Sequence, residues 1–120
     1  MVKKILIAED EKPMARALEL KLNKSGYEAK AVYDGEQAIA ELEANKYDLM
    51  LLDLMMPKLD GFGVLGVMKE KKIKVPVIVS TNLSQEGDIE KAKVLGAKDY
   101  FVKSDTPITG VIEHIKKVLG

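Results

Sequence analysis

Short apolar segments alternate with longer amphipathic ones along the whole chain of 120 residues. The segments "KILIA", "DLMLLD" and "PVIVS" are almost continuous in apolar residues, as is typical of parallel strands that helices cover on both faces. We predict strands at residues 4–8, 27–32, 47–53, 75–80 and 98–103. The second of these alternates apolar with charged side chains, which indicates a strand at an edge of the sheet.

The segments between the predicted strands have the spacing of helices. Met14, Leu18 and Leu22 recur at intervals of four residues after Pro13, and Gly26 ends this helix. The apolar spacing predicts further helices at 35–45, around 64–68, around 89–95 and from 107 onward. We expect Asp105 or Thr106 to cap the last helix.

This alternation predicts an α/β fold with one (βα)5 domain over residues 1–120. Alternating units of this size favour a parallel, doubly wound sheet with helices on both faces. Right-handed crossovers would join its strands. We expect the strand order 2-1-3-4-5, in which the first and third strands are neighbours at the point where the order reverses.

Composition excludes several classes of protein. Lys and Arg number 19, as do Asp and Glu, so the formal net charge is zero, which argues against direct binding of nucleic acid. No apolar run approaches the roughly 20 residues that cross a bilayer, and the first residues lack the long apolar region of a secretory signal. Cysteine is absent, so disulfides and thiolate metal sites are excluded. We therefore expect a cytoplasmic protein without membrane contact.

Asp53 interrupts a run that is otherwise apolar from residue 49 to residue 56. A lone carboxylate in such a setting is costly unless it is paired or bound to a metal. Glu9 and Asp10 follow the first strand and Asp53 ends the third, so the predicted strand order brings all three carboxylates into one pocket at the edge where such sheets bind ligands.

Three neighbouring acids repel one another and need a positive counter-charge. Because the donors are oxygens alone, Mg²⁺ is the ion that suits them best. Lys103 at the end of the fifth strand would add a second positive charge, and Ser80 and Thr81 at the end of the fourth would add hydroxyls. Together these groups are the parts needed to transfer a phosphoryl group and hold it.

Each of these residues also has a plain structural explanation. Acids at strand ends often form turns or cap helices, Asp53 included, and Lys103 alone would be an ordinary solvated lysine. The hypothesis of a phosphoryl-transfer site therefore depends on suitable groups occurring at four strand ends at once.

The chain resembles the receiver domains of two-component response regulators over essentially its whole length. The segment "DLMLLDLMMPKLDGFGVL" is similar to the family's phosphoacceptor segment, and "ILIAEDE" to its acidic pair. The segment "PVIVSTN" is similar to the one that carries the family's Thr or Ser, and "GAKDYFVK" to the one that carries its aromatic residue and lysine. Thr81 lies 28 residues after Asp53 and Lys103 lies 50 residues after it, spacings that also suit the family.

The resemblance implies a phosphorylation-activated switch rather than an enzyme. Asp53 would accept a phosphoryl group from the phosphohistidine of a sensor histidine kinase or phosphotransfer protein, or from a small acyl phosphate. Asp10, Asp53 and the backbone carbonyl of Met55 would ligate Mg²⁺, with Glu9 acting through water.

The resemblance also assigns the remaining site residues. Lys103 would pair with the phosphoryl oxygens, and Thr81 would donate a hydrogen bond to one of them. Tyr100 would turn inward when Thr81 moves and reshape the face made by the fourth helix, fifth strand and fifth helix. The partner at that face would be an output protein or domain, and a phosphorylation-dependent dimer is an open alternative.

Four positions depart from the family pattern or bear on the lifetime of the phosphoryl group. Ser104 follows Lys103 where the family usually has proline after a cis bond, and because a cis bond without proline costs about 3 kcal/mol we predict a trans bond here. Asn82 follows Thr81 where the family prefers a very small residue, so it would narrow the phosphoryl site or add a hydrogen bond. Met55 and Leu83 would flank the site with apolar groups, which predicts slow loss of phosphate.

Two other functions stay open. A degenerate receiver would bind a partner without phosphate, which Ser104 and Asn82 favour and the intact set of charged site residues opposes. A Mg²⁺-dependent phosphohydrolase would often carry a second Asp two residues after the nucleophile, where this chain has Met55, so it lacks a general acid for rapid turnover.

Overall fold

A computed structural model describes residues 2–82 and 86–120 of the chain. Strands and helices alternate through the described residues. In chain order they are β1 (Lys4–Ala8), α1 (Lys12–Lys24), β2 (Glu28–Val32), α2 (Gly35–Ala44), β3 (Leu49–Asp53), α3 (Gly61–Lys71), β4 (Val77–Thr81), α4 (Glu86–Val94), β5 (Asp99–Val102), the short 3-10 helix η1 (Lys103–Asp105) and α5 (Ile108–Leu119).

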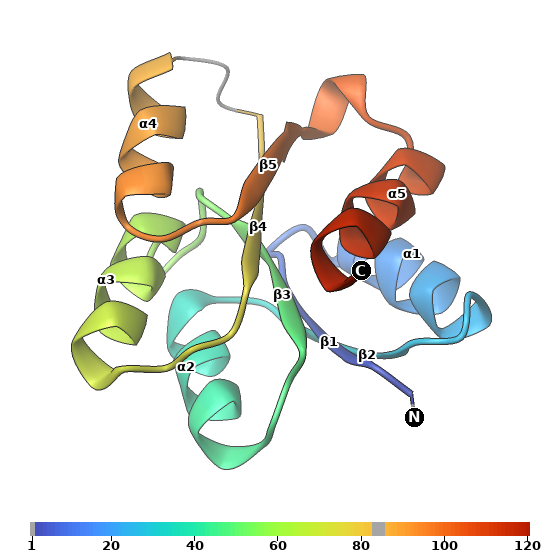
Figure 1. Ribbon diagram of the computed structural model, residues 1–120, viewed down its shortest axis with the longest axis horizontal. Coiled ribbons are helices and arrows are strands. Elements are labelled where there is room, and N and C mark those ends of the chain that lie inside the picture. The colour runs from blue at the N-terminus through green and yellow to red at the C-terminus, as the bar shows by residue number, and fades with distance from the viewer. Residues whose placement is uncertain (1, 83–85) are drawn as a thin grey trace.

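The strands form one parallel sheet in the order β2-β1-β3-β4-β5. Figure 1 shows α1 and α5 on one side of this sheet and α2, α3 and α4 on the other. The predicted doubly wound (βα)5 fold, its strand order and the edge position of β2 are therefore confirmed. None of the described helices is both long enough and apolar enough to cross a membrane.

The central strands supply two apolar cores, one on each face of the sheet. Ile7, Leu51 and Ile78 pack under α1 and α5, while Leu52 and Val79 pack under α2, α3 and α4. Since alternate side chains of β3 and β4 enter opposite cores, every residue of both strands is buried. A polar side chain at the carboxyl end of either strand therefore lies at the border of the apolar cores, next to the surface.

Several element boundaries differ from the predicted ones. The fourth strand starts at Val77 and includes Thr81, and the fifth ends at Val102 because Lys103 begins the 3-10 turn. The predicted cap of the last helix was wrong. Asp105 belongs to the 3-10 turn, so the cap position falls to Pro107, which has no side-chain acceptor to offer the helix.

The N–H groups on the outer edge of β2 and at its two ends donate hydrogen bonds to acceptors on α1 and α2. Alternate residues of a parallel strand bond to the same neighbour, and Glu28 donates its N–H to the Lys3 carbonyl beside β1, so the residues on either side of it point their N–H groups outward. Each outward N–H has an acceptor: Tyr27 donates to the Leu22 carbonyl (3.1 Å), Ala29 to Asn23 Oδ1 (2.9 Å), Ala31 to Glu19 Oε2 (2.9 Å) and Tyr33 to Gln37 Oε1 (2.9 Å). The edge is thereby closed to pairing with another strand.

Removing two of these acceptors should weaken the fold and open the edge. We expect Glu19→Ala combined with Asn23→Ala to lower the free energy of unfolding by about 1–2 kcal/mol in urea titrations, since each lost hydrogen bond is worth roughly 1 kcal/mol. Sedimentation should also show association that grows with protein concentration. The control is Arg16→Ala with Lys21→Ala, two exposed positions on the same helix. Equal stability and equal monomer content in both variants would contradict the role assigned to the acceptors.

Candidate functional site

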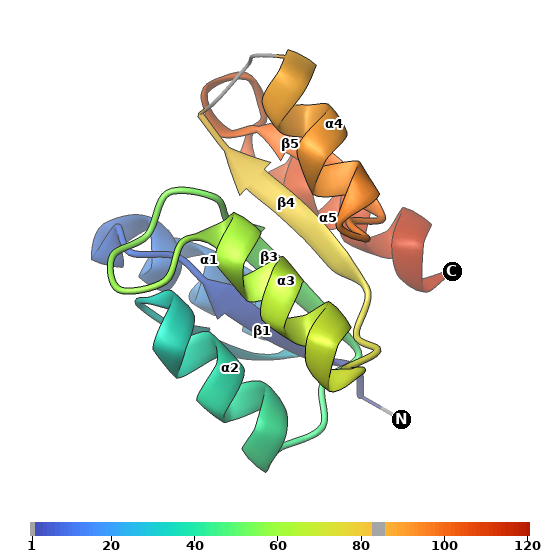
Figure 2. The ribbon, with the colours of Figure 1, turned by 90° about the vertical axis from the view of Figure 1, so that its left-hand side faces the viewer.

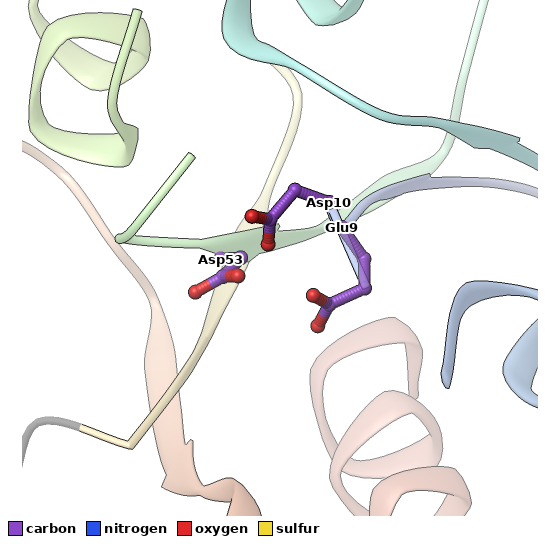
Figure 3. Close-up of side chains that lie close together, drawn as sticks. All are labelled: Glu9, Asp10 and Asp53. Carbon is purple, nitrogen blue, oxygen red and sulfur yellow. The ribbon is translucent and has the colours of Figure 1, made fainter. Parts of the chain in front are cut away.

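Three carboxylates meet at the carboxyl ends of β1 and β3. The ladder pairs Ala8 with Leu52, so the next residues along the two chains, Glu9 and Asp53, lie side by side at this edge of the sheet. One carboxylate oxygen from each of Glu9, Asp10 and Asp53 lies within 4.8 Å of the others, and Figure 3 shows the three side chains gathered in one place. Glu9 and Asp53 are buried, at 2% and 4% exposure, while Asp10 is exposed. The structure thus brings the predicted acidic residues together.

Lys103 supplies a positive charge directly to this cluster. Its Nζ lies 3.1 Å from Asp53 Oδ2 and also contacts Glu9 Oε1. The lysine side chain is only 6% exposed, so this ion pair is largely shielded from water. The peptide bond between Lys103 and Ser104 is trans, as predicted, and the 3-10 turn that begins at Lys103 carries the side chain to the cluster without a proline.

Asp53 is held at both carboxylate oxygens. Oδ1 accepts a hydrogen bond from the Met55 N–H at 3.1 Å, and Oδ2 accepts one from Lys103. Burial raises the pKa of Asp53 to about 7, and the charge of Glu9 adds to the rise, while the Met55 N–H and Lys103 oppose it. Burial thus favours the protonated form of Asp53 relative to an ordinary, solvated aspartate.

The acidic partners of Lys103 keep this ammonium charged. Burial alone would lower the pKa of Lys103, but the hydrogen bond to Glu9 and the charges of Asp53 and Glu9 outweigh that effect and raise it. Lys103 is thus a fixed cation next to Asp53.

The cluster opens into a hollow of about 230 Å³ at the surface. Asp10, Glu11, Asp53, Met55, Asn82 and Lys103 line it. Its charged oxygen donors are the carboxylates of Asp10, Glu11 and Asp53, and such donors fit a hard cation such as Mg²⁺ that retains several waters. Within residues 2–82 and 86–120 no other three acidic or histidine side chains lie so close together. Glu9, Asp10, Asp53 and the Met55 carbonyl are the groups that could hold the ion.

Neither of the two predicted switch residues, Thr81 and Tyr100, is among the residues that line the hollow. Thr81 is the last residue of β4, is 1% exposed and precedes Asn82, which does line the hollow. Tyr100 lies in β5 on the side of α4, where Lys93 Nζ is 5.4 Å from its ring centroid. Ser80 instead faces a small apolar cavity beneath α1 and α5. Leu83 lies outside the described residues.

Glu11 is a member of the site that the sequence analysis missed. Its Oε1 lies 3.4 Å from Lys103 Nζ, and its N–H donates a hydrogen bond of 3.1 Å to Glu9 Oε2. The sequence did hold a signal, because Glu11 directly follows the acidic pair in "EDE". Its contact with Lys103, 92 residues further along the chain, is made only by the fold, so no pattern in the neighbouring sequence could predict it.

Comparisons with known proteins identify one family. The family model described as "Response regulator receiver domain" matches residues 5–112. The alkaline phosphatase synthesis transcriptional regulatory protein PhoP of Bacillus subtilis is 38% identical over 107 residues, which are 89% of this chain and 45% of that protein. The chain therefore spans less than half the length of this curated relative.

Solved structures that resemble this chain are response regulators as well. The receiver domain of the Francisella response regulator 1452 has a TM-score of 0.90 and 30% identity, with 98% of this chain and 96% of that one covered. The phosphorylated cyanobacterial phytochrome response regulator RcpA has a TM-score of 0.83 and 31% identity, with 98% and 91% covered.

Proposed function

We infer the function from the premise that this chain belongs to the response regulator receiver domains, the signalling switches of two-component systems. We propose that Asp53 is the phosphoacceptor of this switch. The observation that carries the proposal is the position of Asp53 at the hollow, between two further carboxylates and the buried Lys103 ammonium. The phosphorylated state in which the similar protein RcpA was solved supports the same reading.

The donor would be the phosphohistidine of a sensor kinase or phosphotransfer protein, or a small acyl phosphate. A carboxylate oxygen of Asp53 forms the new O–P bond while the P–N bond of the phosphohistidine breaks, and the electron pair leaves with the imidazole ring. The Met55 N–H and Lys103 orient the Asp53 carboxylate before the attack. Lys103 then pairs with the oxygens of the bound phosphoryl group.

Glu9, Asp10, Asp53 and the carbonyl of Met55 are the groups that would hold Mg²⁺, with Glu9 acting through water. When bound, the ion neutralises charge on the phosphoryl oxygens and favours the ionised form of Asp53. The chain's own contribution is a group of carboxylates gathered at the carboxyl ends of β1 and β3.

The output of the switch would pass through Thr81 and Tyr100. Phosphorylation adds charge and strong acceptor oxygens, to which the Thr81 hydroxyl donates. Tyr100 lies on the neighbouring strand toward α4, so movement at the end of β4 reaches the face made by α4, β5 and α5. An output protein or domain would bind that face. Turnover would be limited to slow hydrolysis, because Met55 places an exposed apolar side chain at the rim of the hollow.

A Mg²⁺ titration tests the proposed ligand set. We expect Mg²⁺ at ten times its Kd to increase the free energy of unfolding by about 1.4 kcal/mol, because the ion binds only the folded chain. Asp10→Asn should lose most of this gain while it keeps the fold, since Asp10 is exposed. Glu90→Gln on α4 is the control and should respond as the wild type does. A full Mg²⁺ response in Asp10→Asn would remove Asp10 from the site.

A further inference from the structure

The loop of residues 54–60 between β3 and α3 lies against the start of α2. A Cβ atom added to Gly35 would lie 2.0 Å from the Leu59 carbonyl oxygen and 2.7 Å from Leu59 Cβ, whereas ordinary van der Waals contacts begin at about 3.4 Å. The clash would be with main chain, which cannot rotate away as the end of a side chain can. Only glycine therefore lets the loop lie this close to α2.

Asp34 adds a second connection between the same two segments. This buried side chain caps α2, because its Oδ1 accepts a 2.8 Å hydrogen bond from the Gln37 N–H. Its Oδ2 lies 3.8 Å from Lys58 Nζ in the loop. Lys58 itself has a φ of 68°, a left-handed conformation that costs a non-glycine residue roughly 1 kcal/mol. The loop thus keeps a strained residue beside its contact with α2.

Leu59 also contacts α3 from the other side. A Cβ on Gly63 would lie 2.5 Å from Leu59 Cδ1, so this side chain fits between the first turns of two helices. Figure 2 shows α2 and α3 side by side, with the loop that leads into α3 beside the start of α2. Leu59 together with the two glycines that it lies against, Gly35 and Gly63, is called the loop seat below.

We propose that Gly35 is a positioning residue of the phosphoacceptor site, acting through the loop seat; this rests on the function proposed above. The same loop carries Met55, whose N–H donates to Asp53 Oδ1 and whose carbonyl is a proposed Mg²⁺ ligand. Gly35 contributes no ligand of its own. By fixing Leu59 it fixes the path of the loop, and with it the main chain of Met55.

The test compares two glycine-to-alanine variants by calorimetric Mg²⁺ titration and by phosphorylation with acetyl phosphate. Gly35→Ala should weaken Mg²⁺ affinity roughly 10-fold, as the loss of a residue that supports a metal ligand commonly does. Its phosphorylation should be slower at equal Mg²⁺. Gly66→Ala in α3 is the matched control, because its Cβ would meet no atom of the described residues within 4 Å. It should keep wild-type affinity and unfold at slightly higher urea concentration.

A second variant protects the test against a failure of Gly35→Ala to fold. Leu59→Ala keeps the carbonyl oxygen and Cβ that lie beside Gly35 and removes the side-chain end that lies against Gly63, the other contact of the loop seat. It leaves the backbone of α2 unchanged and should weaken Mg²⁺ affinity in the same direction. Wild-type Mg²⁺ affinity in a folded Gly35→Ala or in Leu59→Ala, with only stability reduced, would overturn the positioning role. If the wild type and Gly66→Ala also failed to bind Mg²⁺ or take up phosphate, both this inference and the proposed function would fall.

Discussion

Lys103→Met is expected to lower the free energy of unfolding of the metal-free protein by about 3–5 kcal/mol at pH 8. The substitution removes the ammonium that faces both Glu9 and Asp53, and it leaves two buried carboxylates against each other. The loss should shrink at pH 5, where Asp53 can take up a proton and only one charge remains. Urea denaturation in the presence of EDTA at the two pH values measures it.

Two comparisons separate this effect from a general loss of a lysine. Lys71→Met removes an ion pair of 3.0 Å with Glu43, but both side chains are about half exposed, so we expect a loss of less than 1 kcal/mol. Mg²⁺ should restore part of the stability of Lys103→Met, since a cation at the acidic cluster replaces the lost charge.

Phosphorylation of Lys103→Met by acetyl phosphate should still be roughly 100-fold slower than that of the wild type, because one donor to the phosphoryl oxygens is missing. Equal losses in the two variants would contradict the central role of Lys103.

Asp53→Asn should stabilise the metal-free protein by about 4 kcal/mol at pH 8. Burial and the charge of Glu9 raise the pKa of Asp53 to about 7 in the folded chain, against 3.8 for an ordinary Asp. At pH values between these two pKa values, Asp53 is protonated in the folded state and ionised in the unfolded state. The wild type therefore loses stability as the pH rises from about 4 to 7, and the loss is complete above 7. The amide of Asn does not ionise, so Asp53→Asn does not lose this stability as the pH rises.

The sign of this pH dependence is the feature to check. The difference in unfolding free energy between Asp53→Asn and the wild type, measured in EDTA, should be largest at pH 8 and should fall by about half or more at pH 5. Glu90→Gln, an exposed position on α4, should show no such trend. A difference that stays constant from pH 5 to 8, or that grows toward pH 5, would contradict the raised pKa of Asp53.

The sequence was sufficient to predict the sheet and the convergence of the acids. Continuous apolar runs identify strands buried on both faces, and in a parallel sheet the carboxyl ends of neighbouring strands meet at one edge. Glu9, Asp10 and Asp53 could therefore be placed together from their positions at the ends of two strands. Lys103 was placed at the same edge by the same reasoning.

What the sequence did not reveal depends on backbone paths between the regular elements. The 3-10 turn at Lys103 shifted the cap of α5 from Asp105 or Thr106 to Pro107, because local spacing does not show where a turn interrupts the chain. The contact of Gly35 with Leu59 joins residues far apart in sequence, and a glycine beside an aspartate reads equally well as an ordinary helix start. Such contacts follow from how the loops pack over the sheet.

The measurement that tests the central claim most directly is the intact mass of the protein after incubation with Mg²⁺ and acetyl phosphate, for the wild type and for Asp53→Ala. We expect the wild type to gain one phosphoryl group only when Mg²⁺ is present, to lose it slowly once the donor is removed, and Asp53→Ala to gain none. The same gain in Asp53→Ala would contradict Asp53 as the acceptor. A wild type that gains nothing from acetyl phosphate or from a phosphorylated histidine kinase would contradict the switch itself and favour a binding module that works without phosphate.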